Sequence, residues 1–91
     1  MGFSFRLFNK KIDIYNEWTY SIGIWNDNIL FIGCKDNTIK FIDFSKGKII
    51  QNLIGHNDKV LTIKKIYHPK YGNCLISQNS GNSEIKLWIN N

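Results

Sequence analysis

The sequence predicts an all-β protein built from antiparallel strands. Among its 91 residues 43% are hydrophobic and 14% aromatic, isoleucine dominates the apolar set, and alanine is absent. β-branched and aromatic residues suit a pleated, half-buried surface, so this composition favours strands over helices. Apolar residues also alternate with small or polar ones, as in Ile22-Gly23-Ile24 and Ile85-Lys86-Leu87, which is the period expected of strands.

Clusters of asparagine, aspartate and glycine divide the chain into short segments. Examples are Asn26-Asp27-Asn28, Lys35-Asp36-Asn37, Ser45-Lys46-Gly47 and Ser80-Gly81-Asn82. Such residues form tight turns, and their spacing of about ten residues indicates antiparallel meanders. We therefore expect strands over residues 3–8, 11–15, 18–25, 29–34, 38–43, 48–54, 60–67, 74–78 and 84–89.

The chain contains an internal repeat. Residues 29–43 (ILFIGCKDNTIKFID) align without a gap to residues 75–89 (LISQNSGNSEIKLWI), at an offset of 46 residues. Further upstream WTYSI matches KVLTI at a shorter offset, because residues 67–73 are longer than the corresponding residues 25–28. A period in the forties with four strands per unit indicates a repeat architecture.

Specific residues of this repeat resemble the WD-repeat family of β-propellers. The second unit opens with Gly55-His56 and closes on Ile85-Lys86-Leu87-Trp88. The first unit departs from the family pattern, since Tyr15 stands where its histidine would fall and Ile42 replaces its tryptophan. Phe5-Arg6-Leu7-Phe8-Asn9 follows the closing pattern of an earlier unit.

The resemblance implies antiparallel four-stranded propeller blades, about two of them, in an incomplete ring. Residues 1–91 then form one WD-repeat region: residues 1–16 end a preceding repeat, residues 17–54 form a first, degenerate repeat, and residues 55–91 form a second. Two blades cannot close a ring, because propellers have about four to eight. We expect the chain to be part of a larger propeller. The alternatives are that it completes itself by self-association, or that it is a truncated gene product without function.

In this family a histidine, a serine or threonine, an aspartate and a tryptophan form a buried hydrogen-bond network in each blade. Gln78 lies where the small hydroxyl is expected, with Ser77 adjacent, and Asn82 replaces the aspartate. The expected network residues are His56, Ser77, Asn82 and Trp88, with Asp36 as the remaining member in the first unit. Unpartnered buried polar groups cost about 1 to 3 kcal/mol each, so hydrophobic burial must stabilise the first blade.

No residue pattern predicts catalysis. No second histidine, cysteine or carboxylate lies at metal-ligand spacing from His56 or His68, and no nucleophile motif is near them. Asp36, Asp43 and Asp58 fall in turns, where carboxylates bind the backbone. No glycine-rich phosphate loop precedes a helix. We therefore expect a protein that is not an enzyme and that holds no metal or cofactor.

Two groups of residues are candidates for binding a partner. Trp18 and Trp25 flank the opening strand of the first unit, whereas Lys64-Lys65 and Lys70 surround His68 in the longer loop of the second. Loops on a rigid scaffold are common binding sites. The sequence therefore predicts a non-catalytic module or scaffold that binds proteins or peptides. The alternative is a nucleic-acid-binding module, which the net charge of +5 permits but the scattered lysines disfavour.

The remaining features concern location in the cell. Cys34 and Cys74 have no neighbouring histidines, so we expect buried thiols in a reducing compartment. No apolar run approaches the roughly 20 residues of a membrane span, and the N-terminus lacks the apolar stretch of a signal peptide. These features predict an intracellular protein, in the cytoplasm or nucleus, without a membrane partner.

Overall fold

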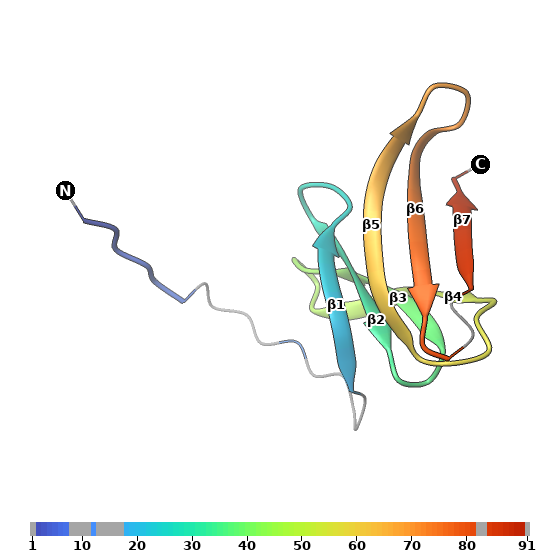
Figure 1. Cartoon of the computed structure of the whole chain (residues 1–91). Helices are drawn as coiled ribbons and strands as arrows, with labels where there is room; N and C mark the ends of the chain where they lie inside the picture. Colours follow the sequence, from blue (N-terminus) through green and yellow to red (C-terminus); the bar gives the residue numbers. More distant parts are fainter. Residues whose placement is uncertain (1, 8–11, 13–17, 82–83, 91) are drawn as a thin grey trace.

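The structure, a computed structural model, describes residues 2–7, 12, 18–81 and 84–90. Within these residues the chain forms two antiparallel sheets and no helix (Figure 1). Sheet A contains, in order, β1 (Thr19–Ile24), β2 (Ile29–Cys34), β3 (Thr38–Asp43) and β4 (Lys48–Ile54). Sheet B contains β5 (Val60–His68), β6 (Gly72–Asn79) and β7 (Ile85–Ile89). The predicted all-β class is confirmed.

Strand prediction succeeded wherever two turn signals enclose an apolar run. The strands predicted over residues 29–34, 38–43 and 48–54 have the same bounds in the structure, and β1, β5, β6 and β7 begin and end within two residues of their predictions. The strand predicted over residues 3–8 is wrong in its described part, because residues 2–7 form no strand and lie apart from both sheets (Figure 1). Alternation alone does not make a strand, since backbone groups need a partner. Of the segment 11–15 only Ile12 is described, and it lies in no strand.

The turns owe their shape to side chains that bind the backbone. After β3, the Asp43 carboxylate accepts hydrogen bonds from the Ser45 hydroxyl at 2.7 Å and the Lys46 N–H at 3.1 Å. These two bonds hold the pKa of Asp43 below its ordinary value. Gly47 completes this turn with a φ of 65°, which L-residues with a side chain adopt only at a cost.

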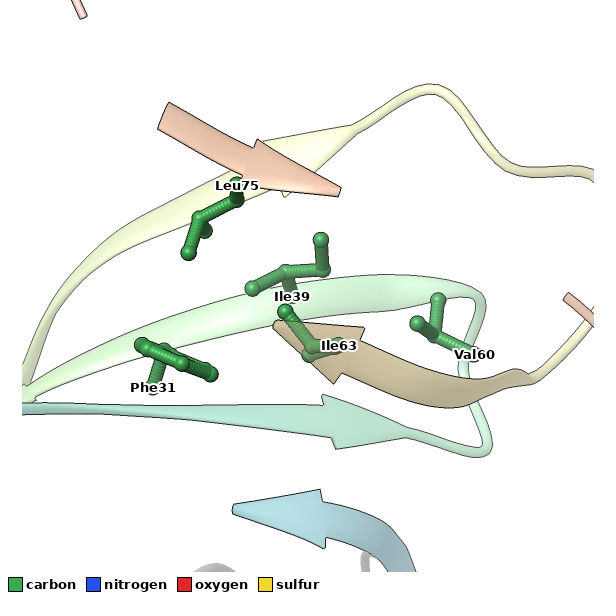
Figure 2. Packing of buried hydrophobic residues seen from close by; sticks show 5 residues of the cluster. All are labelled: Phe31, Ile39, Val60, Ile63 and Leu75. Carbon is green, nitrogen blue, oxygen red and sulfur yellow. The ribbon is translucent and has the colours of Figure 1, made fainter. Parts of the chain in front are cut away.

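The main core lies between the two sheets (Figure 2). Its buried residues are Phe31 and Ile39 of sheet A with Val60, Ile63 and Leu75 of sheet B. The sheets approach each other where β5 contacts β1 and β2, and the Ile63 N–H donates a hydrogen bond to the Ser21 hydroxyl across this contact at 3.2 Å. Between β4 and β7 the two sheets instead leave an open cleft, lined by Leu53 and Trp88 among others.

A second buried cluster covers the opposite face of sheet A. It consists of Ile32, Cys34 and Ile42, with Ile12 packed against it. Cys74 is buried in sheet B. The prediction that both cysteines are buried is therefore confirmed.

The strand registers correct the gap-free alignment of the repeat. Leu30 lies opposite Ile42 in sheet A, and Leu75 lies opposite Trp88 in sheet B. The offset is thus 46 residues from Ile42 to Trp88 but 45 from Leu30 to Leu75, so the turn after β6 contains one additional residue. Ser77 consequently takes the place that Ile32 has in sheet A, on the same face as Trp88.

Candidate functional site

Three side chains of sheet B form a continuous hydrogen-bonded chain. The Trp88 Nε1–H of β7 donates to the Ser77 hydroxyl oxygen of β6 at 2.7 Å. The same oxygen lies 2.6 Å from Nε2 of His56, which belongs to the link between β4 and β5. We name this group the His–Ser–Trp chain; it joins the segment that enters β5 to two strands of the sheet.

The donors of this chain can be assigned from chemistry. The indole of Trp88 can only donate, so the Ser77 oxygen accepts there and its hydroxyl is left to donate to His56 Nε2. A neutral imidazole then carries its proton on Nδ1, which is buried and has no hydrogen-bond partner. The nearest carboxylate oxygen, of Glu84, lies 3.9 Å away.

Burial sets the protonation state of His56. Loss of solvation lowers the pKa of His56, the positive charge of Lys86 lowers it further, and Glu84 opposes both only in part. The imidazole is therefore neutral at pH 7. Ser77 is only 1% exposed, so its hydroxyl lies out of reach of a dissolved substrate and serves to connect strands.

This protonation state predicts a pH dependence of stability. The unfolded chain binds a proton at His56 below pH about 6.5, whereas the folded chain resists that protonation. The free energy of unfolding should therefore be constant above this pH and fall as the pH drops from about 6.5 towards 5. Urea denaturation at several pH values from 8 to 5 measures the decline. His56→Asn should flatten the profile, and an unchanged decline in that variant would contradict the assignment.

Packing explains why glycine precedes His56 in the Gly55-His56 dipeptide. A Cβ atom on Gly55 would lie 2.7 Å from Cη2 of the Trp88 ring, which is closer than side-chain carbons approach. The ring of His56 lies 6.0 Å from that of Trp88, tilted by 55°. Glycine at position 55 thus lets the backbone pass close to the indole of Trp88, which belongs to the same hydrogen-bonded chain as His56.

Sheet A lacks this polar chain. The places of Ser77 and Trp88 are taken by Ile32 and Ile42, each 2% exposed. Asp36, predicted as the remaining network residue, binds its own turn: its carboxylate accepts from the Thr38 N–H at 3.2 Å.

The surroundings of Asp36 also fix its charge. Its other oxygen pairs with the ammonium of Lys40 at 3.0 Å. Partial burial acts to raise the pKa of Asp36, but the hydrogen bonds from Thr38 and Lys40 outweigh it and lower the pKa. The predicted network residue Asn82 lies outside the described residues.

An open cleft of about 260 Å³ lies between the sheets where they diverge. We name it the aromatic cleft. Sheet A and its first turn contribute Trp25, Phe41, Ile50 and Leu53, and sheet B contributes Leu75 and Trp88. The rim is polar, with Asn26, Gln51 and Asn90.

Two of the predicted binding residues contact each other, and one of them, Trp25, lines this cleft. The ammonium of Lys65 lies 5.0 Å from the centre of the Trp25 ring and donates a hydrogen bond to the Trp25 carbonyl oxygen. Trp25 is half-buried, and its ring lies 5.7 Å from that of Phe41. Lys64, the preceding residue, lies opposite Ile76 on the other face of sheet B.

The other predicted binding residues lie elsewhere. Trp18 is 64% exposed at the far end of β1, with the Lys35 ammonium 4.4 Å from its ring centre. His68 closes the turn between β5 and β6, because its Nδ1 accepts the backbone N–H of Lys70 at 3.0 Å and that of Tyr71 at 3.3 Å. The candidates thus do not form a single surface.

The cleft residues Phe41, Leu53 and Leu75 escaped the sequence analysis. Each is an apolar residue in an alternating strand, and such residues are usually core. Nothing in their spacing shows that the two sheets diverge beside them. Only Trp25, next to a turn, gave a signal.

Two other features are absent from the described residues. In the described part of the chain, no three histidine, cysteine or acidic residues gather closely enough to hold a metal ion. Across residues 2–7, 12, 18–81 and 84–90, no helix has the length and apolar character needed to cross a membrane.

Fold and site together define an all-β protein of two packed antiparallel sheets, one of them fastened by the His–Ser–Trp chain. No protein-family model matches the sequence, and no curated protein matches it. Among solved structures, the chain is similar to the crystal structure of the computationally designed Ika4 protein, with a TM-score of 0.65 and 19% sequence identity over 88% of this chain. The match spans 46% of that protein. At this identity the likeness shows the fold alone.

Proposed function

We propose that the chain is part of a WD-repeat β-propeller and acts as a non-catalytic module that binds proteins or peptides. The His–Ser–Trp chain carries the proposal. Its residues belong to the unit that opens with Gly55-His56 and closes with Trp88, the order that resembles the family. The hydrogen bonds of 2.6 and 2.7 Å at Ser77 match the network which that resemblance implies.

The stacking of the sheets supports successive blades. Ile39 and Phe41 belong to the face of sheet A that turns towards sheet B, whereas their equivalents Ile85 and Leu87 lie on the face of sheet B that turns away. Each sheet therefore presents the same kind of face in the same direction. Such an arrangement can be repeated by further sheets on either side, as in a propeller.

Apolar residues on the outer faces support neighbours of this kind. On sheet B, Ile85 is 67% exposed, and on sheet A, Ile22 and Ile24 are 70% and 66% exposed. Contiguous apolar surface on a sheet face is a common interaction site. In this proposal, further repeats of the same kind cover the outer faces of sheets A and B.

The lysines favour a protein partner over nucleic acid. Lys40 is occupied by Asp36 and Asn52, while Lys64 and Lys65 lie on opposite faces of sheet B. A nucleic-acid interface needs basic side chains gathered along one groove or stripe. Lys64 and Lys65, adjacent in β5, do not share such a stripe.

Peptide display tests the proposal against the nucleic-acid alternative. We expect the immobilised chain to enrich peptides from a random library. Labelled single-stranded and duplex DNA should bind weakly and should dissociate when salt is raised from 50 to 200 mM, because phosphate contacts release counterions. A library without enrichment, or DNA binding that shows sequence preference at high salt, would contradict it. Light scattering on the same sample adds a second check, because a stable folded monomer at high concentration would contradict the need for neighbouring blades.

A further inference from the structure

We propose that the aromatic cleft binds an aromatic side chain of a partner peptide, and that Lys65 pairs with an acidic residue beside that side chain. The inference rests on the proposed function as a binding module and names the site and the chemistry of the partner. Three features carry it: the walls of the cleft, its position between the sheets, and the cation held against Trp25 in its wall.

The walls suit a flat ring. Trp25, Phe41 and Trp88 surround the cleft, and Leu53 and Leu75 complete its apolar lining. Aromatic rings attract one another in offset or edge-on arrangements. A closed cavity of about 150 Å³ holds benzene, so a cleft of about 260 Å³ has room for a phenylalanine or tyrosine ring.

The position of the cleft leaves it open in a longer stack of sheets. Neighbours on the outer faces would cover Ile22 on sheet A and Ile85 on sheet B, which point away from the cleft. The cleft lies between sheets A and B and is lined by residues of both. A complete propeller and an occupied cleft are therefore compatible.

A positive charge lies against Trp25, one of the residues that line the cleft. The Lys65 ammonium is held above the Trp25 ring and by the Trp25 carbonyl oxygen. It has three N–H donors, and that bond uses one. Among the described residues, no carboxylate lies within salt-bridge distance of it. The arrangement complements an acidic residue next to the bound ring.

Blocked tripeptides provide the probe. One has phenylalanine between two glutamates, a second has phenylalanine between two lysines, and a third has alanine between two glutamates. They are titrated into the full chain while the indole N–H signals are followed by NMR. Trp25 and Trp88 line the cleft, whereas Trp18 lies beyond the other end of β1, roughly 20 Å from Trp25 along the strand. The tryptophans thus report binding inside and outside the site.

We expect the signals of Trp25 and Trp88 to shift and that of Trp18 to remain. The acidic phenylalanine peptide should bind about ten-fold tighter than the alanine peptide because it buries a ring. It should bind about three-fold tighter than the lysine peptide because of one exposed ion pair. Equal binding of the phenylalanine and alanine peptides, or shifts centred on Trp18, would overturn the proposal.

Two adjacent lysines supply matched variants. Lys65→Glu and Lys64→Glu change the net charge equally, but only Lys65 is shown against Trp25 of the cleft wall, whereas Lys64 lies on the other face of sheet B. Lys65→Glu should remove or reverse the preference for acidic flanks, and Lys64→Glu should keep it. Equal losses in both variants would reduce the effect to overall charge and refute the site.

A cleft-filling variant separates this proposal from the proposed function. Leu53→Trp places a larger side chain in the cleft, and circular dichroism verifies that it folds. Display-selected peptides should bind this variant at least about ten-fold more weakly, since the ring is excluded. Selected peptides that bind it as well as the parent chain would leave the module function standing and refute the cleft. A parent chain that enriches no peptide would contradict the proposed function itself.

Discussion

Ser77→Ala is expected to lower the free energy of unfolding by about 3 kcal/mol, because it removes the shared partner of two polar groups at once. The Trp88 N–H loses its acceptor and His56 Nε2 loses its donor. Ser77 is 1% exposed, so water cannot replace the hydroxyl without opening the sheet. Urea denaturation followed by tryptophan fluorescence measures the loss.

Ser45→Ala is the control for this experiment. Ser45 also donates to a side chain, at 2.7 Å, but in an exposed turn. Its loss should cost less than about 1 kcal/mol. A cycle with Trp88→Phe extends the test, since the cost of Ser77→Ala should shrink once the indole donor is absent. Full additivity of the two substitutions would show that the bond does not stabilise the sheet.

Gly33→Ala should destabilise the chain by about 2 to 3 kcal/mol through overpacking. The added Cβ would lie 2.6 Å from the Val60 carbonyl oxygen and 3.2 Å from Cδ1 of Ile63. The first of these atoms belongs to the backbone of the other sheet, so the contact can be relieved only by moving the sheets apart. Thermal unfolding and the denaturation midpoint measure the effect.

Gly2→Ala controls for the replacement of glycine itself. No atom lies within 4 Å of the Cβ position at Gly2, and a neutral result is expected. If Gly33→Ala were also neutral, the sheets would not be in close contact at β2 and β5. The comparison therefore tests the packing of the two sheets directly.

Local signals determined which parts of the fold could be predicted. The bounds of β2, β3 and β4 followed from turn residues such as Asp36 and Gly47, whose effects extend over only a few residues. Residues 2–7 show the limit of such reasoning: Phe3 and Phe5 alternate as in a strand, but they are 90% and 93% exposed and contact no sheet. An alternating segment becomes a strand only if it can pair with the edge strand of a sheet. That edge strand is distant in the sequence, and the alternation itself does not show whether it is available.

The site was predictable only in its strongest residues. His56 and Trp88 stood at positions given by the resemblance, and Ser77 was expected as the hydroxyl next to the aligned position of Gln78. The one additional residue in the turn after β6 explains why Ser77 takes that position, and this insertion leaves no local mark in the sequence. Trp25 and Lys65 were chosen as separate candidates. The contact between them depends on the packing of sheet A against sheet B, and no sequence pattern within one repeat unit predicts that packing.

The contrast between the two sheets has a consequence for how each tolerates mutation. Ile32 and Ile42 hold sheet A by contact alone, and contact between aliphatic side chains accepts many shapes if the volume is kept. His56, Ser77 and Trp88 hold sheet B by bonds that each need a particular atom at a particular place. Sheet A can therefore change one residue at a time, whereas in sheet B the loss of His56 or Trp88 removes one of these bonds and the loss of Ser77 removes both.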